Sequence, residues 1–92
     1  MYLEIVSPEA TLFAGEVTSV TVPGVNGEFQ MLENHAPIVS LLQEGKVKVK
    51  GNLAIEEAFQ SKFSKGNDGE TILAITSGTV EMKDNKVIVL AD

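Results

Sequence analysis

Hydrophobic and polar residues alternate with a period of two along most of this chain. The clearest case is Lys46–Lys50, where Val47 and Val49 point to one side and three lysines point to the other. This pattern is typical of a β-strand that is buried on one face only. Leu3–Val6 is a second predicted strand, which the following Ser7-Pro8 would end because proline cannot donate to a strand ladder.

Three further segments add to the β pattern, with one irregularity. Ser19–Val22 alternates, but Val17 is one residue out of phase with it. An extra residue must fit between them, which predicts a β-bulge near Thr18 and Ser19. Thr71–Thr76 and Lys86–Ala91 are nearly continuous apolar runs, and such runs predict strands that are covered on both faces.

Turn-forming residues separate these segments. Pro23-Gly24 and Asn26-Gly27 predict two consecutive turns, and Asp84-Asn85 predicts the two-residue tip of a hairpin. Many short strands with turns every eight to twelve residues or so indicate an all-β sandwich or barrel. The chain contains no internal repeat and no low-complexity segment.

One segment departs from the β pattern. Between Asn52 and Gly66, apolar residues recur at helical spacing, at Ile55, Ala58, Phe59 and Phe63. Asn52 could serve as the N-cap and Gly66 lies just past the end, with acidic residues early and lysines late, as a helix dipole favours. We therefore expect a short helical insertion near residues 53–65. The alternative is an extended hairpin with a long tip.

Size and composition narrow the class of protein. The 92 residues suffice for one domain, residues 1–92, with a single modest core. Cysteine is absent, which excludes disulfides, thiolate nucleophiles and cysteine-ligated zinc. The net charge of −6 argues against a nucleic-acid partner, because nucleic-acid binders carry a basic face. The N-terminus lacks the features of a secretory signal, and no apolar run approaches the about 20 residues that span a bilayer. A soluble, acidic, cytosolic domain is expected.

The segment Gly27–Pro37 holds the chain's single histidine and raises the question of chemistry. His35 with Glu28 and Glu33 provides too few ligands for a closed zinc site. No serine lies in a nucleophile-elbow pattern, and the glycines do not form a phosphate-binding loop. Taken alone, these residues favour a structural loop histidine over a catalytic or metal-binding one.

A set of short motifs points to a known family. In order along the chain these are IVSPE, LFAGEV, VTVPG, GEF, HAPIVSLL, GKVKV, SGTVEM and VLAD. Together they resemble the N-terminal domain of the epsilon subunit of F-type ATP synthase, the subunit called delta in mitochondria. The resemblance covers the whole chain except roughly residues 51–70. It implies an all-β fold, a single β-sandwich of about ten short strands, in agreement with the alternating pattern.

The chain departs from the family pattern in several places. The family usually has Leu-Pro-Gly-His-Ala-Pro where this chain has Leu32–Pro37, and Asn34 is the best non-glycine substitute if that position needs a positive φ. Family members have Gly-Glu-Leu-Gly where this chain has Gly27–Gln30, which keeps Glu28. Beyond the position of Asp92 the family usually continues into a C-terminal helical hairpin. The nucleotide-binding and self-inhibiting functions of the family belong to that hairpin, so the resemblance does not imply them for these residues.

The resemblance implies a non-catalytic rotor subunit without cofactor or metal. Such a subunit lies in the central stalk, links the gamma subunit to the polar loops of the membrane c-ring, and takes part in ATP synthesis coupled to proton transport. By motif match, Glu28 and His35 would contact the c-ring, both from loops at one end of the sandwich. Ser7, His35 and Ser40 would lie near gamma. The implied location is peripheral, on the cytoplasmic face of the bacterial cell membrane, without membrane insertion and with the catalytic head reached through gamma.

A second hypothesis from another class is a stand-alone β-sandwich recognition module for a peptide or a sugar. Such a module would expose a groove of aromatic side chains, whereas this chain has four Phe, one Tyr and no Trp. A small hydrolase is a more distant third, because no nucleophile and base are paired in the sequence.

Overall fold

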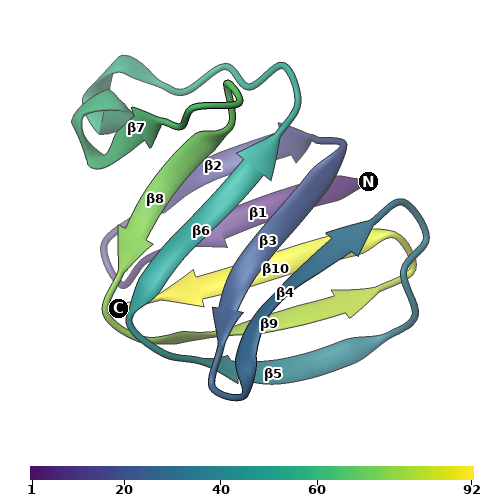
Figure 1. Cartoon of the computed structure of the whole chain (residues 1–92). Coiled ribbons are helices and arrows are strands. Elements are labelled where there is room, and N and C mark those ends of the chain that lie inside the picture. Colours follow the sequence, from purple (N-terminus) through teal and green to yellow (C-terminus); the bar gives the residue numbers. More distant parts are fainter.

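The computed structural model describes all residues 1–92, which form ten β-strands and one short 3-10 helix (Figure 1). The strands are β1 Tyr2–Val6, β2 Thr11–Glu16, β3 Ser19–Gly24, β4 Gly27–Leu32, β5 Ile38–Leu42, β6 Gly45–Lys50, β7 Phe63–Lys65, β8 Thr71–Ile75, β9 Gly78–Lys83 and β10 Lys86–Ala91; the helix is η1 Glu57–Lys62. This confirms the all-β class and the expected number of strands.

One continuous hydrogen-bonded sheet folds over into the two layers of a sandwich. Its strand order is β2-β1-β10-β9-β5-β3-β6-β8-β7, and β4 pairs with β3 outside this path. The first layer contains β2, β1, β10, β9 and β5, and the second contains β3, β4, β6, β8 and β7 (Figure 1). The layers are joined where β5 meets β3 through the pair Gly24 and Leu42. The other ends of the order, β2 and β7, form the open side.

The core lies between the layers and follows the alternation seen in the sequence. Nineteen buried apolar residues form one cluster. On β6, Val47 and Val49 are buried as predicted, and on β1 Leu3 and Ile5 have no exposed surface. No buried side-chain nitrogen or oxygen lacks a hydrogen-bond partner, so the core carries no uncompensated polar group.

The turn predictions hold in part. Asp84 and Asn85 have φ angles of 52° and 62° and form the two-residue tip between β9 and β10, as predicted for a type I′ hairpin. The β3–β4 hairpin turns at residues 25–26, and Gly27 follows with a φ of 123°. Pro23-Gly24, by contrast, is not a turn but the end of β3. A Cβ on Gly24 would lie 2.8 Å from the Gly27 carbonyl oxygen, so glycine is needed there for the close approach of the two strands.

The predicted bulge near Thr18 and Ser19 is wrong, because the chain crosses there from one layer to the other. β2 ends at Glu16 in the first layer, and β3 begins at Ser19 in the second. The Val17 N–H donates to the Met1 carbonyl oxygen at 2.9 Å and the Thr18 N–H to the Lys50 carbonyl oxygen at 2.8 Å. The phase of the hydrophobic pattern changes because the inward direction differs between the layers.

The two long apolar runs are not covered on both faces, which corrects the second strand prediction. β8 and β10 both alternate between buried and more exposed positions. Val87 and Val89 of β10 are fully buried, whereas Leu90 is 50% exposed. The opposite layer of the sandwich covers the inner face of each of these strands, but no segment of the chain covers their outer faces. The apolar outer residues therefore face solvent.

The predicted helix near 53–65 is much shorter than expected. Only η1 forms, with Glu56 rather than Asn52 at its N-cap position and no side-chain cap. Phe63 leaves the helix because β7 pairs with the edge of β8, and a strand edge with free backbone groups competes well with a short uncapped helix. The alternative of an extended hairpin is thus partly correct. Leu53, Ile55, Phe59 and Phe63 still pack against the core.

Candidate contact surface

Glu28 is the second residue of β4, an edge strand that pairs only with β3. Its carboxylate Oε2 lies 3.2 Å from the Lys48 Nζ of β6, across the intervening β3. The Glu28 side chain remains 53% exposed and that of Lys48 35% exposed. Both charges therefore stay hydrated and can be reached by another molecule.

His35 lies in the turn between β4 and β5 and is half-buried. Its backbone N–H donates to the Leu32 carbonyl oxygen at 3.0 Å, and its Nδ1 lies 2.7 Å from the Ala36 carbonyl oxygen. Because a carbonyl oxygen can only accept, Nδ1 carries the proton, and in the neutral ring Nε2 is left as an acceptor. His35 thus keeps one ring nitrogen for a donor on another molecule.

Ser7 and Ser40 are both bound to the backbone. The Ser7 hydroxyl lies 3.2 Å from the Ala10 carbonyl oxygen, and the Ala10 N–H lies 3.3 Å from the hydroxyl. Ser7 therefore holds the turn between β1 and β2. Ser40 lies in the middle of β5, and its hydroxyl donates to the Leu41 carbonyl oxygen at 3.1 Å.

The structure does not bring Glu28 and His35 to one end of the sandwich, which corrects that part of the sequence interpretation. β4 separates them, since Glu28 stands near its start and His35 beyond its last residue, Leu32. Glu28 is also a strand residue and not a loop residue. What the two share is the β4 edge. Ser7, at the far end of β1, lies away from both.

An apolar outer face on the first layer was missed by the sequence interpretation. Val39 and Leu41 of β5 are 74% and 63% exposed, and Leu90 of β10 is 50% exposed. The register aligns Leu41 with Thr79, Thr79 with Leu90, and Leu90 with Val6 in one row across four strands. The signal in the sequence was the apolar run of β10, whose outer residues required a cover that this chain does not supply.

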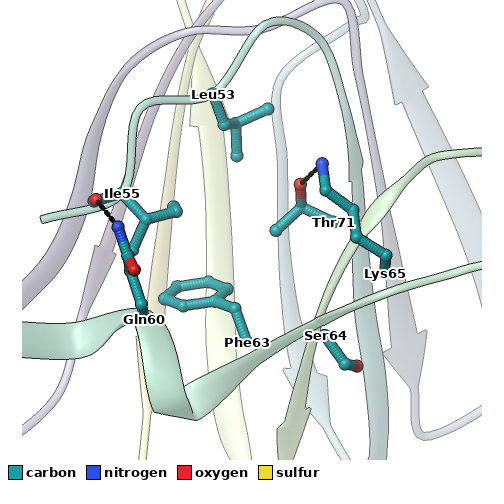
Figure 2. A pocket seen from close by; sticks show the side chains of 7 residues that line it. All are labelled: Leu53, Ile55, Gln60, Phe63, Ser64, Lys65 and Thr71. Carbon is teal, nitrogen blue, oxygen red and sulfur yellow. Dashed lines mark hydrogen bonds between the residues drawn. The ribbon is translucent and has the colours of Figure 1, made fainter. Parts of the chain in front are cut away.

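A cavity of about 280 Å³ lies under the segment that contains η1 (Figure 2). It is lined by Leu53, Ile55, Gln60, Phe63, Ser64, Lys65 and Thr71. Figure 2 shows the Phe63 ring beside Ile55 and, across from them, Lys65 Nζ, which donates to the Thr71 hydroxyl at 3.2 Å. The lining offers two hydroxyls and an ammonium group but no His, Asp or Glu side chain to act as a general base. The cavity therefore holds no nucleophile and base pair.

The most connected polar cluster lies at the His35 end. The Met1 ammonium group contacts Glu33 and, at 3.3 Å, Glu16. The hydrogen bond to Glu33 raises the pKa of this ammonium group above its ordinary value of 8.0. The bonds from the ammonium group and from Asn85 lower the pKa of Glu33 below its ordinary value of 4.5. The cluster thus favours both charged forms.

Two further features of the structure bear on function. No group of three or more His, Asp or Glu side chains is arranged to hold a metal ion. The single helix, η1, has neither the length nor the apolar character needed to cross a membrane.

Comparison with known proteins identifies close relatives. The family described as "ATP synthase, Delta/Epsilon chain, beta-sandwich domain" matches residues 1–92. The ATP synthase epsilon chain of Chlorobaculum tepidum is 37% identical over 90 residues, which cover 98% of this chain and 86% of that one. The epsilon chain of Caulobacter vibrioides is 46% identical over 77 residues, which cover 80% of this chain and 88% of that one. The epsilon chain of Campylobacter curvus is 35% identical over the whole of this chain but only 60% of its own length.

Solved structures support the fold. A chain from the central stalk and c-ring of the Tetrahymena thermophila mitochondrial ATP synthase superposes with a TM-score of 0.75 at 13% identity, covering 99% of this chain and 62% of that one. A chain of the Euglena gracilis mitochondrial ATP synthase superposes with a TM-score of 0.71 at 18% identity, covering 97% of this chain and 48% of that one. This chain therefore spans about half to two thirds of the solved chains. By sequence and by fold, the chain belongs to the family of ATP synthase delta/epsilon chain β-sandwich domains.

Proposed function

We propose that this chain is a non-catalytic central-stalk subunit of a rotary ATP synthase, in which residues 1–92 form one domain that links the gamma subunit to the c-ring. Family membership supports the stalk role. The proposed location is the cytoplasmic side of the membrane, peripheral and held there by the complex. The catalytic head is reached through gamma, and the domain itself performs no chemistry.

The observation that carries this proposal is the uncovered apolar face of the first layer. Val39 and Leu41 are exposed on β5, and Leu90 lies across β9 from Leu41 with Thr79 between them, while Glu81 of β9 stands beside Val39. Burying such side chains is worth roughly 25 cal/mol per Å² of apolar surface, and this gain favours a partner that covers them once the costs of association are met. Exposed apolar side chains gathered on one face are typical of protein interfaces. We assign this face to gamma. Ser7 follows the end of β1 in this layer, and Ser40 lies on β5 between Val39 and Leu41, with its side chain on the opposite side of the strand.

The second contact is the β4 edge, which we assign to the c-ring. Glu28 stands near the start of this edge and His35 beyond its end, so a row of polar loops running along β4 can reach both. His35 lies between β4 and β5, so it borders both the ring contact and the apolar face. This position agrees with a role for His35 toward both partners. Lys48 beside Glu28 gives the edge one charge of each sign.

Association with gamma tests the proposal most directly. Purified gamma and this chain, mixed at micromolar concentration, are expected to elute together in size-exclusion chromatography. Separate elution of the two proteins would contradict the proposal. For the ring contact, Glu28→Cys in the assembled synthase should form disulfides with cysteines placed in the polar loops of the c-ring. Ser64→Cys, on β7 in the second layer, is the matched control and should form none.

A further inference from the structure

Asn85 occupies a turn position whose backbone conformation does not require an asparagine side chain. It is the second residue of the type I′ tip between β9 and β10, and its φ of 62° requires only a residue that tolerates the left-handed region. Glycine or asparagine meets that need equally well. Its carbonyl oxygen serves β1, where it accepts from the Tyr2 N–H at 3.0 Å. The side-chain amide is free for another task.

That amide reaches a loop more than fifty residues away in the sequence. Its Oδ1 accepts from the Asn34 N–H at 2.8 Å, and its Nδ2 donates to Glu33 Oε2 at 2.7 Å. Both polar ends of one planar group therefore bind consecutive residues of the loop between β4 and β5. This is a two-point attachment, which fixes the orientation of the loop as well as its position.

The attached loop is the one that carries His35. Asn34 has a φ of 60°, and the His35 N–H closes the turn onto the Leu32 carbonyl oxygen. Apart from the two Asn85 bonds, one polar contact joins this turn to a distant segment. It is the pair between Glu33 and the Met1 ammonium group, which involves the same carboxylate as Asn85.

We propose that Asn85 is a positioning residue that clamps the loop of residues 33–37 and thereby presents His35 to its partners. The clamp itself stands on the two hydrogen bonds of its amide. Only its consequence for docking rests on the function proposed above. Asn85 acts through the loop.

The donor and acceptor pattern makes asparagine specific for this task. A carboxylate at position 85 would still accept from the Asn34 N–H, but it would face the Glu33 carboxylate with no proton to share, and the like charges would repel. Glycine would keep the turn and lose both bonds. The matched control is Asp84→Gly, because Asp84 has a φ of 52° in the same tip and no hydrogen bond to the loop.

Amide hydrogen exchange of the full chain, followed by NMR, tests the clamp. In Asn85→Gly, the Asn34 amide should exchange at least about tenfold faster, while amides of the buried strands keep their rates. Asp84→Gly should leave Asn34 unchanged. Equal Asn34 exchange in Asn85→Gly and the parent chain would overturn the proposal. Exchange that rises across all strands alike would also overturn it, since Asn85 would then serve general stability.

A rescue experiment separates the clamp from any effect of the turn. Asn85→Asp alone should accelerate Asn34 exchange at neutral pH. Adding Glu33→Gln supplies an amide whose nitrogen can donate to the new carboxylate and whose oxygen can still accept from the Met1 ammonium group, so the double variant should recover most of the lost protection. Glu33→Gln alone is the control for the weakened Met1 pair. If Glu33→Gln alone exchanges like the parent chain and the double variant shows no recovery, the Asn85 and Glu33 pair does not hold the loop.

Affinity for purified gamma, measured by titration of the same variants, tests the consequence for docking. Asn85→Gly should weaken binding several-fold, and Asp84→Gly should not. If His35→Ala weakens binding but Asn85→Gly does not, the positioning role is wrong. If neither variant changes affinity for gamma or for the c-ring, the docking role of His35 fails, and the exchange result alone decides the clamp.

Discussion

One outer row of the first layer differs in chemistry from a comparable row of the second layer, although the inner faces of both layers follow the same pattern. In the first layer one cross-strand row reads Leu41, Thr79, Leu90 and Val6. In the second layer a comparable row reads Gln30, Thr21, Lys48, Ile72 and Ser64. The first row is mostly apolar and the second is mostly polar. Both rest on strands whose inner residues are buried valines, leucines and isoleucines.

This contrast separates the inner positions, which stabilise the fold, from the outer positions, which are available to contact a partner. Inner positions must be apolar in both layers because the core depends on them. Outer positions carry no such demand, so a lysine at 48 and a leucine at 41 are equally compatible with the sandwich. An exposed leucine costs solubility without contributing to folding, which is why we attribute it to a partner. The following predictions test this division, beginning with the largest expected effect.

Placing charge on the apolar face should abolish the association with gamma. The double variant Leu41→Lys with Leu90→Lys is expected to weaken binding by at least about 100-fold, or about 2.8 kcal/mol. The midpoint of denaturant unfolding should change little, because both side chains are half or more exposed. The control is Ala74→Lys on the exposed outer face of β8, which should bind normally. Equal losses in both variants would remove the distinction between the faces.

Alanine substitutions at Gly78 and Gly45 allow the packing of the two layers to be compared, because each glycine is the first residue of a central strand. A Cβ on Gly78 would lie 2.2 Å from the Leu90 carbonyl oxygen, whereas one on Gly45 would lie 2.7 Å from the Pro23 Cβ. Overpacking costs typically 1–3 kcal/mol. We expect Gly78→Ala to lower the free energy of unfolding by about 3 kcal/mol and Gly45→Ala by about 1 kcal/mol. The reverse order in denaturant titration would contradict this account of the first layer.

The β4 edge should matter for docking but not for folding. Glu28→Ala and His35→Ala are each expected to change the free energy of unfolding by no more than about 0.5 kcal/mol, because exposed ion pairs and loop side chains contribute little. Coupling of proton transport to ATP synthesis in reconstituted synthase should fall in both variants. A loss above about 2 kcal/mol in His35→Ala, with intact coupling in Glu28→Ala, would make both residues structural.

The smallest expected effect is a pH dependence from the Met1 and Glu33 pair. The lowered pKa of Glu33 contributes stability that is fully present above pH 4.5 and is lost as the pH falls through the pKa of Glu33 in the folded state. The raised pKa of the Met1 ammonium group contributes stability that is fully present below pH 8.0 and is lost as the pH rises through the pKa of this group in the folded state. The unfolding midpoints of the parent chain and Glu33→Gln should therefore differ most between these limits. A difference that stays constant across the whole range would exclude this pair as its source.

The strands and the family could be predicted from the sequence because their signals are local. Val47 and Val49 alternate with lysines, and Asp84-Asn85 is a hairpin tip in any context that allows two positive φ angles. The site could be predicted only in part. Glu28 and His35 are proposed from the motifs alone, and their placement at the two ends of β4 was not predicted, since it depends on where that strand begins and ends.

The sequence by itself determined the inward residues of β6, the hairpin tip at Asp84-Asn85 and the all-β class, because period-two alternation and turn chemistry act within a few residues. Tertiary structure decided the rest. It made Val17 and Thr18 a crossing between layers and shortened the helix in favour of β7 pairing with β8. It also left Leu90 uncovered and brought Asn85 to Asn34. Each of these outcomes depends on contacts between segments distant in the chain, whose free energy no local pattern contains.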